Sequence, residues 1–251
     1  MPRLQAVFWD VDGTLADTEM DGHRPAFNQA FADLGWGWQW NRAEYQRLLA
    51  IPGGTQRVAQ YAIERGEVLD ATQLEDLRRC KQLHYLNRIR GGAVSLRPGV
   101  SRLLNQLVHA GLQQWIVTSS GRASVEALLE GLFANADVPF DGVVSANDVE
   151  RHKPYPDPYL CALERSGADL DGSVAIEDSA AGLIAAHEAS LSCLVTPSLW
   201  DQQLPKQLHR ACAVFNHLGE ATLPHLQTSG PPCAKGMVTL EYLQSLVDST
   251  C

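Results

Sequence analysis

The chain has 251 residues, of which 45% are hydrophobic and 20% charged, enough to bury a full core. Its formal net charge of −9 argues against a general binder of nucleic acids or anionic membranes, because both surfaces are polyanionic. No stretch approaches the roughly 20 apolar residues of a spanning helix. We therefore expect no membrane partner, and from the charge no nucleic-acid partner; a monomer is a separate expectation.

The first predicted element is a buried strand at Ala6–Trp9, and the sequence DVDGT follows it directly. The segment before this strand has neither a secretory h-region nor a cleavage site. We therefore expect a bacterial cytoplasmic protein, with cyanobacteria among the candidate sources, or a protein of the plastid stroma whose transit peptide has been removed.

The next part of the chain, from about residue 18 to residue 91, contains helix-like segments and no convincing buried strand. Such a helical run directly after a first strand is typical of a second domain inserted in a loop. We predict a core domain at 1–16 and 95–226, a helical cap domain at 17–94, and a linker with a C-terminal tail at 227–251. The tail could form a short helix.

In the remaining sequence, short apolar runs alternate with amphipathic ones, which is the pattern of a parallel sheet with crossover helices. The fold class predicted is therefore α/β, with a Rossmann-like core. The expected strands are Gln114–Thr118, Gly142–Ser145, Val174–Ile176, Ser192–Val195 and Ala213–Phe215, and the expected helices are Val100–Ala110, Ser124–Leu132, Pro158–Arg165 and Ala180–Ala189. Gly111, Gly131 and Gly167 fall where helices are expected to stop.

Polar residues follow several of these strands, at the sheet edge where α/β proteins bind ligands. A carboxylate such as Asp10 can attack a phosphoryl group, and a second one, Asp12, can transfer protons. Thr118 could hold a phosphoryl oxygen and Lys153 could neutralise charge, whereas the sequence ED at 177–178 suits Mg²⁺. Taken singly, the Thr118 and Lys153 signals are more typical of a turn and a solvated lysine, and the ED signal is as consistent with a helix cap as with a metal site.

In this order and spacing, DxDGT, Thr118, Lys153 and EDS together resemble the four motifs of the haloacid dehalogenase-like hydrolases, over nearly the whole chain. The resemblance implies that Asp10 is the nucleophile and becomes an aspartyl phosphate. It implies that Asp12 is the general acid and base and gives Mg²⁺ its backbone carbonyl. The helical insertion resembles the small mobile cap of that family.

The same resemblance assigns the remaining core residues. Thr118 and Lys153 would bind the transferring phosphoryl group. Asp178 would be a ligand of Mg²⁺ together with Asp10, and Glu177 would support the metal directly or through water.

The sequences ADTEMDGHRPAFNQAF, WNRAEYQRLLAIPGG and LRPGV are similar to the CbbY branch of the family, which is close to the beta-phosphoglucomutase and phosphoglycolate phosphatase branches. CbbY enzymes convert xylulose-1,5-bisphosphate, an inhibitor of Rubisco, to xylulose 5-phosphate. The substrate-binding residues that this similarity implies, with their neighbours, are Glu19, His23, Tyr45, Gly53, Gly54, Arg57, Ser119 and Arg122. The chain departs from the family at Thr55, where a lysine is usual, and this leaves Arg57 as the obvious cation for a distal phosphate.

The sequence thus predicts a Mg²⁺-dependent phosphatase of a small sugar phosphate, most closely matching xylulose-1,5-bisphosphate. A phosphomutase of the beta-phosphoglucomutase type would use the same core motifs and stays an alternative. A phosphoglycolate phosphatase and a non-catalytic binding protein that keeps the fold are further alternatives.

Overall fold

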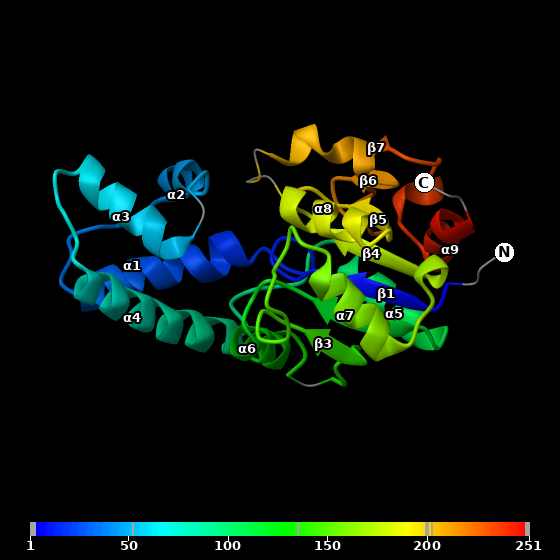
Figure 1. Cartoon of the computed structure of the whole chain (residues 1–251), viewed down its shortest axis with the longest axis horizontal. Helices are drawn as coiled ribbons and strands as arrows, with labels where there is room; N and C mark the ends of the chain where they lie inside the picture. Colours follow the sequence, from blue (N-terminus) through cyan, green and yellow to red (C-terminus); the bar gives the residue numbers. More distant parts are fainter. Residues whose placement is uncertain (1–3, 52, 135, 199–200, 202, 249–251) are drawn as a thin grey trace.

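The computed structural model describes residues 4–51, 53–134, 136–198, 201 and 203–248. Its centre is a seven-stranded sheet in the order β3-β2-β1-β4-β5-β6-β7 (Figure 1). The strands are β1 Ala6–Trp9, β2 Gln113–Val117, β3 Gly142–Val144, β4 Ser173–Glu177, β5 Ser192–Val195, β6 Ala213–Phe215 and β7 Gln227–Ser229. The pairs from β3 across to β6 are parallel, which confirms the predicted α/β fold class, and β7 is an antiparallel edge strand.

The register of the central strands brings the motif residues together. Trp9 at the end of β1 pairs with Ile116 of β2 on one side and with Ile176 of β4 on the other. These three strands therefore end at the same level, and the residues that follow them meet at one edge of the sheet. Asp10 and Thr118 lie at this edge together with the carboxylates that close β4.

Helices cover both faces of the sheet, because its central parallel strands carry apolar residues on both sides. Val7 and Trp9 pack against α5, α6 and α9, whereas Phe8 packs with residues of α7 and α8 on the other face.

None of the helices within the described ranges is long and apolar enough to cross a membrane. The helices are η1 Glu19–His23, a π-helix, then α1 Arg24–Asp33, α2 Arg42–Leu48, α3 Gly54–Glu64, α4 Ala71–Arg90, α5 Val100–His109, α6 Arg122–Leu132, α7 Asp157–Ser166, α8 Ala180–Glu188 and α9 Leu240–Asp248, with short 3-10 turns η2 Leu170–Gly172, η3 Leu204–Lys206, η4 Leu208–Arg210 and η5 Ala234–Gly236.

The helices from η1 to α4, which we call the cap, project from one end of the sheet (Figure 1). They have a hydrophobic core of their own, in which Phe31, Trp38 and Trp40 pack edge to face. Two cap helices begin at good N-caps: the Asn41 side chain accepts from the third residue of α2, and Asp70 forms a capping box with Gln73 of α4.

The long helix α4 reaches from the cap to α6 of the core (Figure 1). Gly131 makes this approach possible, since a Cβ at that position would lie 1.9 Å from the carbonyl oxygen of Ile89. Arg90 also pairs with Glu130 at 2.8 Å. As expected, α6 ends beside Gly131, at Leu132; the glycine also permits the close helix crossing, a role that the sequence did not predict. Gly167 ends α7 in the left-handed conformation, also as expected.

The segment after residue 226 differs from the linker and tail that we expected. Gln227–Ser229 forms strand β7 on the edge of the sheet. The terminal helix exists as α9, and its Tyr242, Leu243 and Leu246 belong to the same hydrophobic cluster as β1 and α5. In the described residues, this segment is therefore part of the core.

Candidate active site

A cavity of about 680 Å³ lies between the carboxyl edge of the sheet and the cap. The two residues of the expected site that do not line it are Arg122 and Glu177; the latter is fully buried and contacts Lys153, which does line the cavity. The expected residues that do line it are Asp10, Asp12, Glu19, His23, Tyr45, Gly53, Gly54, Arg57, Thr118, Ser119, Lys153 and Asp178. Core and cap motifs therefore converge on one site.

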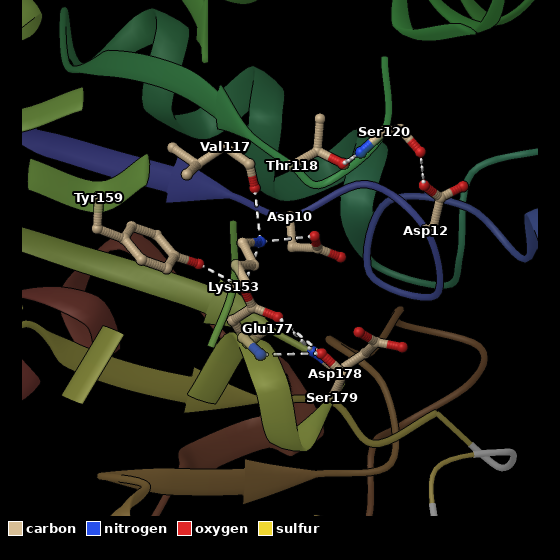
Figure 2. A network of polar contacts seen from close by, with 11 residues as sticks. Asp10, Asp12, Val117, Thr118, Ser120, Lys153, Tyr159, Glu177, Asp178 and Ser179 are labelled. Atoms are coloured by element: carbon tan, nitrogen blue, oxygen red, sulfur yellow. Dashed lines mark hydrogen bonds and ion pairs between the residues drawn. The ribbon is translucent and has the colours of Figure 1, made fainter. Parts of the chain in front are cut away.

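Lys153 joins two of the carboxylates at the sheet edge. Its Nζ lies 2.8 Å from Asp10 Oδ1 and 2.6 Å from Glu177 Oε1, and it also donates to the Val117 carbonyl (Figure 2). Burial alone would lower the pKa of Lys153, but the charges of Asp10 and Glu177 raise it overall. Tyr159 donates to the same Glu177 oxygen at 2.5 Å. Lys153 is thus a buried, permanently charged ammonium beside Asp10.

Asp12 is held by two hydroxyl groups, one on each carboxylate oxygen. Thr18 donates to Oδ1 and Ser120 to Oδ2, both at 2.5 Å. Burial raises the pKa of Asp12, and these two hydrogen bonds only partly offset that effect. Asp10 and Asp12 consequently have different surroundings: an ammonium contacts the first, whereas neutral hydroxyls contact the second. An acid for proton transfer requires the second kind of environment.

Ligand atoms of Asp10, Glu177 and Asp178 lie within 4.8 Å of one another and form a candidate metal centre. Two glycines make room for this group. A Cβ on Gly13, whose φ is +92°, would lie 2.0 Å from Asp178 Oδ2, and one on Gly182 would lie 1.8 Å from Glu177 Oε2. Clustered carboxylate oxygens are the ligand type that Mg²⁺ takes, so the residues present fit the metal that the motifs imply.

Arg97, from the sequence LRPGV, ties the loops at this edge together. Its guanidinium donates to the carbonyl of Gly13, to that of Thr196 at 3.0 Å and to that of Asn216 at 3.1 Å. These carbonyls belong to the segments that follow β1, β5 and β6. Arg97 therefore fixes the turn that contains the first motif.

On the cap side, Glu19, Tyr45 and Arg57 form a connected wall of the cavity. The Tyr45 hydroxyl donates to Glu19 Oε2 at 2.6 Å and accepts from Arg57 Nη1 at 3.2 Å. Arg57 also donates to the carbonyls of Leu48 and Ile51, and it is only 7% exposed. This wall places a fixed positive charge opposite the sheet edge, next to the Gly53 turn that begins α3.

Sequence reasoning missed Lys81 of α4, which brings a second cation to the same wall. Its Nζ lies 2.8 Å from His23 Nδ1 and 4.8 Å from the centre of the Tyr85 ring. Burial lowers the pKa of Lys81 to about 8, and it lowers the pKa of His23 well below its usual range. Because an ammonium can only donate, neutral His23 accepts at Nδ1 and carries its proton on Nε2.

The position of Arg122 corrects our expectation that this residue binds the substrate. Its side chain pairs at 2.8 Å with Asp148, in the loop after β3, and donates to the carbonyl of Val143 within β3. Closeness to Thr118 along the chain does not bring the guanidinium to the cavity, because α6 begins at Arg122 and Asp148 attracts the side chain. Ser119 does line the cavity.

Comparison with known proteins agrees with this geometry. The family model for haloacid dehalogenase-like hydrolases matches residues 7–196, from β1 to the residue after β5. The chain belongs to this family. Among curated relatives, protein CbbY of Rhodobacter capsulatus is 39% identical over 78% of this chain and 86% of its own length. The plasmid-encoded protein CbbY of Cupriavidus necator is 38% identical over 88% of both chains. These relatives confirm the resemblance to the CbbY branch.

Two further relatives bear on the chemistry of the site. A D10N mutant of CbbY from Rhodobacter sphaeroides in complex with xylulose-(1,5)bisphosphate is 33% identical, with a TM-score of 0.73, over 87% of this chain and 96% of the other. The fructose-1-phosphate phosphatase YqaB of Escherichia coli is 30% identical over 76% of this chain and 96% of its own. Together with the family match, these relatives support phosphatase activity for this hydrolase.

Proposed function

We propose that the protein is a Mg²⁺-dependent phosphatase that removes one phosphate from xylulose-1,5-bisphosphate and releases xylulose 5-phosphate. The observation that carries this proposal is the distribution of positive charge in the cavity. Lys153 lies at the sheet edge beside Asp10, whereas Arg57 and Lys81 lie on the cap wall. A substrate with two phosphate groups matches two separate cationic regions.

The reaction begins at Asp10. Lys153 contacts Oδ1, which leaves Oδ2 to attack the phosphorus atom. As the new oxygen–phosphorus bond forms, the bond from phosphorus to the sugar oxygen breaks. Lys153 and Thr118 stabilise the charge on the phosphoryl oxygens during this transfer. The product of the step is an aspartyl phosphate on Asp10.

Asp12 supplies the protons. In the first step its carboxylic acid form gives a proton to the departing sugar oxygen, and in the second step its carboxylate takes one from water. That water attacks the phosphorus, the bond to Asp10 breaks, and inorganic phosphate leaves. Thr18 and Ser120 can accept as well as donate, so Asp12 keeps its hydrogen bonds in both protonation states.

When bound, Mg²⁺ neutralises charge on the transferring phosphoryl group and orients it. Asp10 and Asp178 would hold the ion, with Glu177 as a supporting ligand. These carboxylates lie close together in a buried site. Burial, and to a smaller extent the charges of Asp10 and Glu177, raises the pKa of Asp178 well above its usual range. A divalent cation would compensate this repulsion.

The cap determines the substrate in this proposal. The Arg57 guanidinium and the Lys81 ammonium would bind the phosphate that is not transferred, in the place of the lysine that Thr55 replaces. The neutral His23 would donate from Nε2 to a sugar oxygen. Support for a sugar bisphosphate comes from the CbbY structure that holds xylulose-(1,5)bisphosphate.

A panel of phosphorylated metabolites with Mg²⁺ tests the proposal. It includes xylulose-1,5-bisphosphate, ribulose-1,5-bisphosphate, phosphoglycolate and glucose 1-phosphate, and both phosphate release and sugar isomers are measured. We expect the highest kcat/KM for phosphate release from xylulose-1,5-bisphosphate. Stoichiometric conversion of glucose 1-phosphate to its 6-phosphate would show a mutase instead, and no turnover of any compound would show a non-catalytic protein.

A further inference from the structure

A second group of metal-ligating side chains lies on the cap, outside the residues that line the cavity. It consists of Asp33, the last residue of α1, with Cys80 and His84 on α4. One ligand atom from each lies within 4.8 Å of the others. In the part of the chain that the structure describes, the carboxylate group of Asp10, Glu177 and Asp178 is the other set of this kind.

The spacing of these ligands suits a tetrahedral ion. Cys80 and His84 are four residues apart and share one face of α4. Cys80 Sγ lies 3.7 Å from Asp33 Oδ2, close to the sulfur–oxygen separation of about 3.5 Å around a tetrahedral zinc ion. His84 Nε2 lies 2.6 Å from the same oxygen, and a shared ion would widen this contact to about 3.3 Å. Rotation of partly exposed side chains can provide that change.

The Asp33 carboxylate is already oriented toward the group. Gln29, one turn earlier on α1, donates from Nε2 to Asp33 Oδ1 at 3.0 Å, so that Oδ2 faces Cys80 and His84. A hydrogen bond to the distal oxygen of a ligating carboxylate is the usual supporting contact in metal sites. The Asp33 side chain is 44% exposed, which leaves water access to a fourth coordination position.

We propose that Asp33, Cys80 and His84 bind one divalent transition-metal ion of the zinc class. Thiolate and imidazole select borderline-soft ions and disfavour Mg²⁺, so this site and the catalytic one would take different metals. Binding would release the thiol proton of Cys80, because the thiolate is the ligand form. The ion would join the end of α1 to α4, next to the turn that presents Lys81 to the cavity.

Cobalt(II) is a spectroscopic probe of this site, used on the full-length protein with Mg²⁺ in excess. We expect one equivalent to produce a thiolate-to-cobalt charge-transfer band, which zinc then abolishes by displacement. Cys80→Ser should remove the band. Asp33→Asn and His84→Gln should each weaken cobalt binding by at least about tenfold. Cys161→Ser, which removes another partly buried free cysteine, is the matched control and should keep the band.

The band depends on sulfur coordination, so it separates this site from a carboxylate site that binds cobalt without a thiolate. Absence of the band in the wild-type protein at saturating cobalt would overturn the proposal. Its persistence in Cys80→Ser would also overturn it, as would unchanged affinity in both Asp33→Asn and His84→Gln. In each case the three side chains would be a hydrogen-bonded group and no more.

Discussion

Replacing Lys153 by Met should destabilise the fold strongly, because it leaves two buried carboxylates without their shared cation. The side chain of Lys153 is 4% exposed, and those of Asp10 and Glu177 are 10% and 0% exposed. Removing one partner of a buried ion pair costs about 3–5 kcal/mol, since the remaining charge keeps its desolvation penalty. We expect a loss of that size in the free energy of unfolding at pH 7, together with loss of activity.

The free energy of unfolding of Lys153→Met should also depend on pH. Burial raises the pKa of Glu177 above its ordinary value of 4.5, and the substitution removes the charge and the hydrogen bond of Lys153 that lower it, so only the Tyr159 hydrogen bond still does so. Above pH 4.5 the folded variant therefore binds more protons than the unfolded chain, and its stability should fall as the pH rises from 4.5 through the raised pKa of Glu177. The double variant Lys153→Met/Glu177→Gln should recover about 1–3 kcal/mol, the usual coupling energy of contacting residues.

Urea denaturation followed by far-ultraviolet circular dichroism, with EDTA present, measures these free energies. Tyr159 can still donate to the glutamine side chain, so Glu177→Gln alone is the matched control. A cost below about 1 kcal/mol for Lys153→Met, typical of an exposed pair, would refute the buried-charge reasoning. So would a double variant that is no more stable than Lys153→Met.

Three further predictions test other parts of the site. Gly182→Ala should cost about 1–3 kcal/mol in urea denaturation and reduce kcat, because its Cβ would lie 2.0 Å from the Glu177 carboxyl carbon; unchanged stability and rate would contradict the close contact. Lys81→Met should raise KM for the bisphosphate about ten- to a hundredfold, as loss of a charged hydrogen bond costs about 1.5–3 kcal/mol. The wild-type KM should rise above about pH 8, where Lys81 loses its proton, and the KM of the variant should stay flat; parallel profiles would exclude this role. Gly131→Ala should lower the unfolding free energy by about 1–3 kcal/mol by separating α6 from Ile89, and an unchanged urea midpoint would contradict that crossing.

Much of the sheet was predictable because its strands are buried on both faces. β1, β5 and β6 have the predicted bounds, since each is a short continuous apolar run. Strand β7 was missed because Gln227–Ser229 is a polar, largely exposed edge segment without an apolar pattern. The helix end predicted at Leu132, beside Gly131, is the end of α6, but the close approach of Gly131 to Ile89 was not predictable, because local sequence does not identify a crossing partner.

The core of the site was predictable because its residues follow strands whose ends must meet. Lys81 was not, since a lysine on a long polar helix usually contacts solvent, and only the packing of α4 brings it to His23. Ser120 also went unnoticed, because its contact with Asp12 joins residues 108 positions apart. Arg122 was misplaced because its neighbour in space, Asp148, comes from the loop after another strand.

The most direct test of the central claim is chemical trapping of the phosphorylated residue. The enzyme is quenched in acid during turnover of xylulose-1,5-bisphosphate with Mg²⁺, and borohydride then reduces any aspartyl phosphate to homoserine. The predicted result is homoserine at position 10 in peptide mass spectra, with none at Asp12 and none in an Asp10→Asn variant that still folds but lacks turnover. Unmodified Asp10 during turnover, or full activity of Asp10→Asn, would contradict the account.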